Sequence, residues 1–134
     1  MKQRILTLAL GVGISVLAAQ AHHSISGVYD TGKEVTIEAV VAQFHFVNPH
    51  PFVTVDVANN SGRAQAWRLE MDNLSELTEV GMTSQSLKAG DRVTVTGNPG
   101  RNNPQTLYIR RLDRLADGFR YEQVGSSPRI STTR

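Results

Sequence analysis

The four histidines of this 134-residue chain lie in two close groups, His22 with His23 and His45 with His50. Cleavage after Ala21 would leave a free amino group on His22, next to two imidazole rings. Amine, amide and imidazole nitrogens form a donor set that suits Cu(II) and then Ni(II). An α-amine titrates at about pH 8 and an imidazole at about pH 6.5, so neither costs much to deprotonate at neutral pH. The pair predicts a transition-metal site, and the alternative interpretation is an exposed polar tail.

The second group of histidines surrounds an Asn-Pro-His-Pro loop between two expected strands. An antiparallel third strand would return beside the start of the second, which brings Glu70 close to His50 and within range of His45. A histidine beside a carboxylate is a typical metal corner or an oriented imidazole. We therefore expect metal ligation by His22, His23 and His50, with Glu70 as a weak ligand or as a partner of a ligand. A packed ring at His45 and a tight turn at His50 are the alternatives.

Other catalytic patterns are not found in the sequence. The chain has no Gly-x-Ser-x-Gly elbow, no phosphate loop and no His-Glu-x-x-His motif. It has no cysteine, which excludes thiolate metal sites and cysteine redox chemistry. We therefore expect a protein that is not an enzyme. A copper enzyme with a histidine brace is the least favoured alternative, because it would need an oxidisable substrate and an open coordination position.

The first 21 residues have the three parts of a secretory signal peptide. A basic start, Met1–Arg4, precedes the apolar run Ile5–Ala18, and Ala19-Gln20-Ala21 has the small-x-small pattern of a cleavage site. The apolar run is shorter than the roughly 20 residues of a membrane span. The sequence therefore predicts a periplasmic or secreted protein that is not inserted in the membrane after cleavage.

Charge argues against a nucleic-acid partner. The signal carries Lys2 and Arg4, so cleavage reduces the 14 basic residues to 12, which balance the 12 acidic ones. Two groups of residues keep an alternative open, namely a binding module for a partner protein of the periplasm or membrane, or for an oligosaccharide. One group consists of C-terminal arginines, which form either a basic face or a solvated strand face: Arg101, Arg110, Arg111, Arg114 and Arg120. The other group consists of aromatic residues, which form either a stacking platform or part of the core: Phe44, Phe46, Phe52, Trp67 and Tyr108. Met71 and Met82 are soft copper ligands or core residues.

Hydrophobic alternation along the chain indicates which strands and helices hold these residues in place. It predicts five strands, at 33–47, 52–57, 64–71, 92–97 and 105–115, and one short helix that is capped by Asn73 and ends at Gly81. Three strands, a helix and two strands are the order of a small five-stranded OB-like Greek-key barrel, an all-β fold. A small β-sandwich is the alternative.

The remaining segments are expected to be less regular. Residues 22–32 form an extended leader that spans at most about 35–40 Å, enough to reach either end of a small barrel. The segment Asn98–Pro104 is expected to be a loop, and Phe119 and Tyr121 a short return strand. The predicted organisation is a signal peptide at 1–21, an OB-like domain at 22–121 and a flexible tail at 122–134.

Short motifs along the mature chain also occur together in a known family. They are His-His-Ser at 22–24, Tyr-Asp at 29–30, Val-Asn-Pro-His at 47–50, Trp67, Gly-Met-Thr at 81–83, Ser-Leu-Lys-Ala-Gly-Asp at 86–91 and Asp-Gly at 117–118. In these motifs the chain resembles a family of small, exported, functionally uncharacterised bacterial proteins over about residues 22–121. Family members usually carry Trp at the position of Phe46 and often at Met82. The resemblance implies a periplasmic domain with His22, His23 and His50 among its motif positions.

Overall fold

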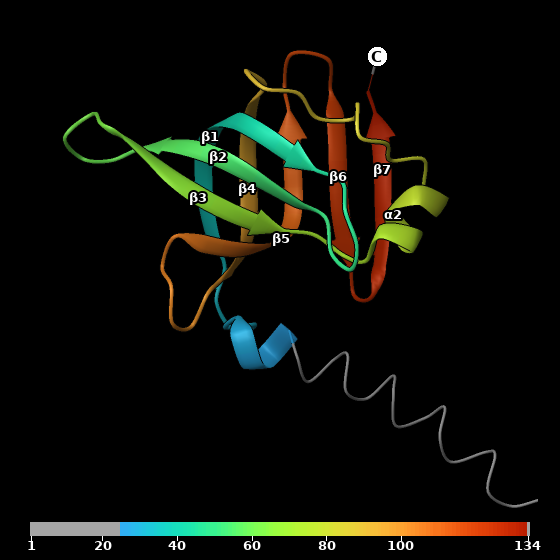
Figure 1. Ribbon diagram of the computed structural model, residues 1–134, viewed down its shortest axis with the longest axis horizontal. Helices are drawn as coiled ribbons and strands as arrows, with labels where there is room; N and C mark the ends of the chain where they lie inside the picture. Colours follow the sequence, from blue (N-terminus) through green and yellow to red (C-terminus); the bar gives the residue numbers. More distant parts are fainter. Residues whose placement is uncertain (1–24, 134) are drawn as a thin grey trace, which may run out of the picture.

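The computed structural model describes residues 25–133, which form a β-rich fold (Figure 1). A short helix, α2 (Leu74–Glu79), lies between the third and fourth of seven strands in the described part of the chain. The strands are β1 (Val35–His45), β2 (Phe52–Ala58), β3 (Ala64–Glu70), β4 (Arg92–Pro99), β5 (Thr106–Arg114), β6 (Phe119–Val124) and β7 (Ser127–Thr132). No helix within residues 25–133 is long and apolar enough to cross a membrane.

Five of the strands close into a barrel. The hydrogen-bonded order is β3-β2-β1-β4-β5-β6-β7, and an additional pairing joins β3 to β5. That pairing is parallel and matches Arg68–Glu70 with Thr106–Tyr108, whereas β1 is antiparallel to both β2 and β4. This connectivity is that of an OB-like Greek-key barrel. The predicted fold class and the place of the helix are confirmed, and β6 and β7 extend the sheet beyond the barrel.

The first strand is shared by both halves of the barrel. Val40 pairs with Asp56 of β2 on one side and with Arg92 of β4 on the other. A register shift follows between Val41 and Gln43 and bends the strand. Before the bend, the side of β1 that carries Val41 faces the core, and after it the aromatic rings at 44 and 46 pack partly against the same core. The bulge therefore changes which face of this long strand points to the core, and this matches the change in its apolar pattern.

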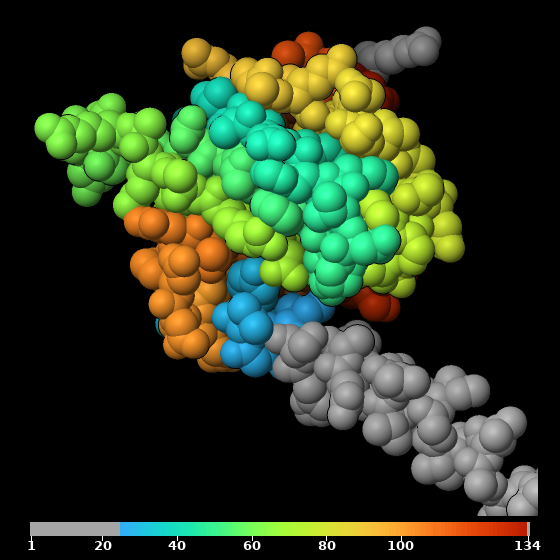
Figure 2. Space-filling model, in the orientation of Figure 1, coloured from blue at the N-terminus to red at the C-terminus, as the bar shows by residue number. Residues whose placement is uncertain are grey.

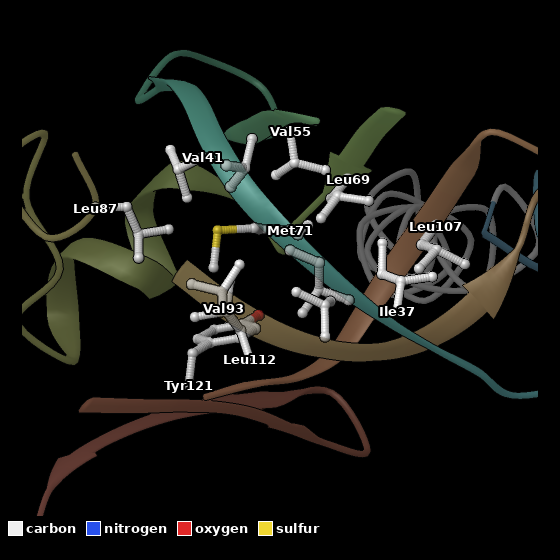
Figure 3. Packing of buried hydrophobic residues seen from close by; sticks show 14 of the residues in the cluster. Ile37, Val41, Val55, Leu69, Met71, Leu87, Val93, Leu107, Leu112 and Tyr121 are labelled. Atoms are coloured by element: carbon white, nitrogen blue, oxygen red, sulfur yellow. The ribbon is translucent and has the colours of Figure 1, made fainter. Parts of the chain in front are cut away.

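One hydrophobic cluster fills the barrel. Val53, Val55, Leu69, Leu107 and Ile109 are fully buried. Figure 3 shows side chains from several strands pointing into this cluster, with Tyr121 of β6 at its lower side. Because burying one large aliphatic side chain contributes about 1.5–3 kcal/mol, this cluster is the main stabilising feature of a chain without disulfides.

The helix begins and ends where the sequence predicts. The Asn73 side chain accepts a hydrogen bond from the Glu76 amide at 3.0 Å, which satisfies an amide at the open helix start. Gly81 follows with a φ of 93°, a left-handed conformation that glycine adopts without strain. Leu77 is fully buried and attaches the helix to the core.

The expected loop at Asn98–Pro104 is wrong at its start. Asn98 and Pro99 belong to β4, and Asn98 is only 2% exposed. Its amide donates to the carbonyl oxygen of Lys33 at 2.7 Å, and its oxygen accepts from Arg110 Nε at 2.7 Å. A polar residue can therefore continue the strand, because both ends of its side chain have partners inside the fold.

The expected flexible tail at 122–134 is also wrong over most of its length. Residues 122–124 complete β6, and β7 pairs with β6 from Ser127 to Thr132 through a turn at Gly125. The alternation of β6 is hard to recognise because one of its buried positions is polar. Gln123 is only 6% exposed, and its partners are Tyr121 and Asp72. The folded domain therefore continues past residue 121.

Candidate functional site

The segment before β1 is docked on the barrel. Residues 25–28 form a helical turn, and Tyr29 makes an isolated bridge with Gly100. The Arg101 amide donates to the Val28 carbonyl at 2.9 Å, and the Asp30 amide donates to the Pro99 carbonyl at 2.8 Å. Figure 2 shows this segment in blue, packed against the orange β4–β5 loop. Residues 25–33, named the docked segment below, are therefore part of the folded domain.

Tyr29 ties the docked segment to β3. Its hydroxyl donates to Glu70 Oε2 at 2.6 Å, and its ring centroid lies 5.7 Å from that of Tyr108. Tyr29 is only 4% exposed. Burial, and then the hydrogen bond to Glu70, raise the pKa of the Tyr29 hydroxyl far above its ordinary value. The hydroxyl therefore keeps its proton and remains a donor.

The loop that carries His50 is fixed against the residues that follow β3. The Pro49 carbonyl accepts from the Leu74 amide at 3.1 Å, and the Pro51 carbonyl accepts from the Met71 amide at 2.9 Å. His50 Nδ1 lies 3.2 Å from the Met71 carbonyl oxygen. Since a carbonyl oxygen only accepts, Nδ1 is the donor in this bond. In the neutral ring, Nε2 then carries the lone pair, which is the arrangement of many histidine ligands to metals.

The docked segment and the His50 loop meet consecutive residues of the chain. Tyr29 binds the side chain of Glu70, and His50 binds the carbonyl of Met71. The register also places His45 opposite Phe52, and Phe52 opposite Glu70. His45, His50 and Glu70 thus share one end of the barrel, as the strand order predicts.

His45 has a different environment from His50. Its ring stacks on Phe52 with centroids 4.2 Å apart and an interplanar angle of 12°. The Arg68 guanidinium, from the strand on the other side of β2, lies 3.5 Å from the Phe52 centroid. We name His45, Phe52 and Arg68 the outer-face stack. The packed-ring interpretation of His45 is therefore correct. Two of the platform aromatics meet a cation, since Arg68 lies over Phe52 and Arg110 lies 5.0 Å from the centroid of Tyr108.

The predicted metal ligands divide into two groups. His22 and His23 lie outside the described residues, so nothing in the structure bears on them. Between residues 25 and 133, no three His, Asp or Glu side chains come close enough together to hold a metal ion. The described contribution to the predicted site is therefore one oriented imidazole at His50, with Glu70 engaged by Tyr29 nearby.

The five arginines that the sequence analysis singles out near the C-terminus all bond within the chain. Arg114 pairs with Asp91 and Asp117, and Asp113 accepts from both Arg111 and Arg120. Burial by itself would raise the pKa of Asp113, but the hydrogen bonds from these two arginines outweigh it and hold the pKa below its ordinary value. Arg101 donates to the Ser26 carbonyl, and Arg110 donates to the Asn98 side chain. These arginines therefore lie on a strand face where each guanidinium already has a partner within the chain.

Most of the remaining candidates are core residues. Tyr108, Met71 and Met82 are buried, and three further aromatic rings pack against the core, namely Phe44, Phe46 and Trp67. A separate hollow of about 430 Å³ is lined by Ala39, Val40, Ala58, Val93, Leu115 and Ala116, with Glu38, Asp56, Arg92 and Thr94 also around it. It contains none of the predicted site residues.

Sequence reasoning missed two groups that shape this end of the barrel. Tyr29 is a lone aromatic residue in a segment with no strand pattern, and only a resemblance motif marks it. Asp72 is 8% exposed and accepts from Gln123 Nε2 at 2.6 Å. Burial, and then the neighbouring Asp72 carboxylate, raise the pKa of Glu76 above its ordinary value. Asp72 and Glu76 are close in sequence at the start of α2, but no local signal predicts that Asp72 meets Gln123.

Comparison with known proteins gives a family and no activity. The model of a family described as "Family of unknown function (DUF6152)" matches residues 11–108, which is most of the chain. No curated protein matches the chain.

Proposed function

The chain belongs to this family of unknown function, and we propose that it is an exported, non-catalytic metal-binding domain that takes copper. His22 supplies its α-amine and its imidazole, and His23 an amide or imidazole nitrogen. His50 supplies a further imidazole, and Glu70 stands beside the site. The proposal requires cleavage of the signal peptide after Ala21.

The orientation of His50 is the observation that carries the proposal. Its Nδ1 is engaged at 3.2 Å by the Met71 carbonyl, so that the lone pair of the neutral ring is on Nε2. The loop around it is held by two backbone bonds from Met71 and Leu74. A fixed ring loses little rotamer entropy when it binds an ion, which favours its use as a ligand.

The docked segment supports the participation of the amino terminus. The Tyr29–Glu70 bond holds this segment next to the residue that His50 binds. Three positions separate His22 from Ile25, the first described residue, and the chain between them spans at most about 10 Å. A mature terminus at His22 therefore stays close to the barrel, because its freedom is limited by that short length.

Ligand chemistry favours copper over the other divalent ions. The donors are an amine and imidazoles, and the chain has no thiolate to offer. Nitrogen donors in a near-planar set suit Cu(II) and then Ni(II), and Cu(II) binds most tightly of the first-row divalent ions. Near neutral pH these donors release their protons readily, so that Cu(II) competes well with protons.

The test compares two forms of the mature protein, one that begins at His22 and one with an added Ala before it. Their Cu(II) affinities are measured by competition with a chelator of known affinity. We expect the added residue to weaken binding by more than tenfold, because it removes the α-amine from the chelate. Equal affinity would overturn the proposed terminal site.

A second pair of variants tests the loop. We expect His50→Ala to weaken Cu(II) binding and His45→Ala to leave it unchanged, because the His45 ring is stacked on Phe52. The two variants remove the same chemical group five positions apart, so they are matched controls. An equal effect of both would contradict the assignment of His50. Intact-mass analysis of exported protein under native conditions checks the terminus and the bound ion together.

The outer-face stack favours a second candidate function, a binding module for an oligosaccharide or a partner protein. Arg68 is exposed and lies over Phe52, and within residues 25–133 it has no ion pair and no side-chain hydrogen bond. A glycan array probed with metal-free protein tests this candidate. Binding that Phe52→Ala abolishes would support it, and binding that needs copper would count against it.

A further inference from the structure

We propose that the hollow on the outer face of β2, β1 and β4 is a binding site for a short zwitterionic peptide of about three residues with an apolar middle side chain. Asp56 and Glu38 attract the ammonium group of the peptide, and Arg92 binds its carboxylate. This site is separate from the proposed copper site and needs neither a metal nor any residue outside 25–133.

The hollow has the size and the lining of a ligand site. Its volume is about 430 Å³, and ligand sites in proteins are concave, mostly apolar and roughly 300–1,000 Å³ in volume. The apolar lining includes Val40 of β1, Ala58 of β2, and two residues that follow β5, Leu115 and Ala116. Val40 is 38% exposed and Leu115 is 83% exposed. Two large apolar side chains therefore meet water at the same hollow, and a bound apolar group would cover them.

The strand register fixes the positions of the charges around this apolar lining. β1 lies between β2 and β4, and Val40 pairs with Asp56 on one side and with Arg92 on the other. Because the side of β1 that carries Val41 faces the core, Val40 and its two partners lie on the outer face. Glu38 lies on the same face, two positions before Val40 and diagonal to both charged partners. An apolar residue therefore separates a carboxylate from a guanidinium.

The three charges around the hollow have no partner within the described part of the chain. Asp56, Glu38 and Arg92 are exposed, and their side chains make no ion pair and no hydrogen bond between residues 25 and 133. The next strand differs, since Asp113, which pairs with Thr94 of β4, accepts from two arginines. A ligand with charge of one sign only would meet a like charge on one side of the hollow, which favours a zwitterion.

The spacing of the strands indicates the length of the ligand. Neighbouring strands lie about 4.8 Å apart, so β2 and β4 lie about 10 Å apart across β1. An extended chain spans at most about 3.5 Å per residue, so a tripeptide spans about 10 Å between its ends. A tripeptide across β1 therefore places its ammonium group at Asp56, its middle side chain over Val40 and its carboxylate at Arg92. A single amino acid carries both charges on one carbon and cannot reach both sides.

Titration of the metal-free protein with the tripeptide Ala-Leu-Ala tests the site, with amide chemical shifts as the readout. We expect saturable binding with a Kd on the order of 0.1 mM and shifts that centre on Val40, Ala58 and Ala116. Acetylation of the amine or amidation of the carboxylate should each weaken binding about fivefold, because each removes one charge pair. Absence of saturable binding would overturn the site. Equal binding of a peptide blocked at both ends, or shifts centred elsewhere on the barrel, would do the same.

Matched variants assign each end of the peptide to its residues. Asp56→Asn combined with Glu38→Gln should weaken binding of the free peptide about fivefold and leave the acetylated peptide unchanged. Arg92→Gln should weaken binding of the free peptide about as much and leave the amidated peptide unchanged. Arg63→Gln is the control, since this exposed side chain lies outside the hollow and has no ion pair within the described residues. Equal weakening of free and blocked peptides would show that these charges do not contact the two ends, which would overturn the inference.

Leu115→Ala separates binding from folding. Because Leu115 is exposed, its truncation removes surface that the peptide covers and leaves the core intact. We expect peptide binding to weaken by about threefold or more at an unchanged urea midpoint. An unchanged affinity would place the apolar side chain of the peptide elsewhere and would overturn the proposed site.

Discussion

Gln123 Nε2 donates to Asp72 Oδ2 at 2.6 Å, across 51 residues of chain. The same side chain accepts the Tyr121 hydroxyl through its oxygen at 2.7 Å. Asp72 also accepts the Asn73 amide at 2.7 Å through its other oxygen. This polar chain joins β6 to the residues between β3 and α2, so the C-terminal hairpin and the barrel are linked by more than apolar contact.

We predict that Gln123→Leu destabilises the protein by about 2–6 kcal/mol. The change removes the partner of Asp72 Oδ2 and the partner of the Tyr121 hydroxyl, and each unsatisfied buried group costs about 1–3 kcal/mol. Urea unfolding followed by the fluorescence of Trp67 measures it. The control is Gln85→Ala, which changes an exposed side chain and should shift stability by less than about 0.5 kcal/mol. Similar midpoints for the two variants would contradict the buried network.

Truncation distinguishes a folded β7 from a flexible tail. A chain that ends at Ser126 loses the buried side chain of Pro128 and that of Ile130, which packs against the core. We expect a loss of about 3 kcal/mol, from the apolar surface that these two side chains bury. A chain that ends at Thr132 keeps both and is the control. A thermal midpoint that is unchanged on truncation at Ser126 would mean that β7 contributes nothing.

The barrel could be predicted because its strands depend on near neighbours in sequence. Alternating Val53 and Val55 and the Asn73 cap are local signals, and the structure contains both features. The start of β6 is predicted as a short return strand at Phe119 and Tyr121, and the structure contains it, but the rest of β6 and all of β7 could not be predicted. The buried Gln123 breaks the apolar period of β6, and its partner Asp72 is far away in sequence. A buried polar position has no local signature, because its hydrogen-bond partner comes from a residue that is distant in the sequence.

One part of the candidate site could also be predicted from the sequence, and another part could not. That His50 and Glu70 share one end of the barrel follows from strand order alone, and the register agrees. That His50 donates through Nδ1 to Met71, and that Tyr29 takes Glu70, depends on the positions of side chains in three dimensions. Alternation and spacing carry no such information. They predict only an extended leader at 22–32 that can reach the barrel, and this is wrong at 25–28, where the chain forms a helical turn.

Two leucines with opposite environments test the position of the core. Leu69 is fully buried, whereas Leu115 is 83% exposed. We expect Leu69→Ala to cost about 2–5 kcal/mol, because it leaves a cavity among packed side chains. Leu115→Ala should change stability by less than about 0.5 kcal/mol. Urea midpoints of both variants check this, and a comparable loss for Leu115→Ala would mean that this turn is covered in solution.

Glu76 should make stability depend on pH in a direction opposite to that of most carboxyl groups. Burial, and then the neighbouring Asp72 carboxylate, raise its pKa in the folded protein, and its Oε2 atom is buried without a hydrogen-bond partner within residues 25–133. The folded state therefore holds a proton on Glu76 at pH values where the unfolded state has released it. Stability from this group is complete below the unfolded pKa and is lost as pH rises through the folded pKa.

We predict that the free energy of unfolding falls as pH rises above about 4.5, until Glu76 is ionised in both states. Asp113 and Asp117 have lowered pKa values, so their contribution is lost only as pH falls below the ordinary carboxyl range. The two effects therefore occupy separate pH windows. Glu76→Gln, which cannot ionise, should remove the decline above pH 4.5 and leave the acid-side loss in place. Urea unfolding at a series of pH values measures both, and a decline that persists in Glu76→Gln would assign it to another group.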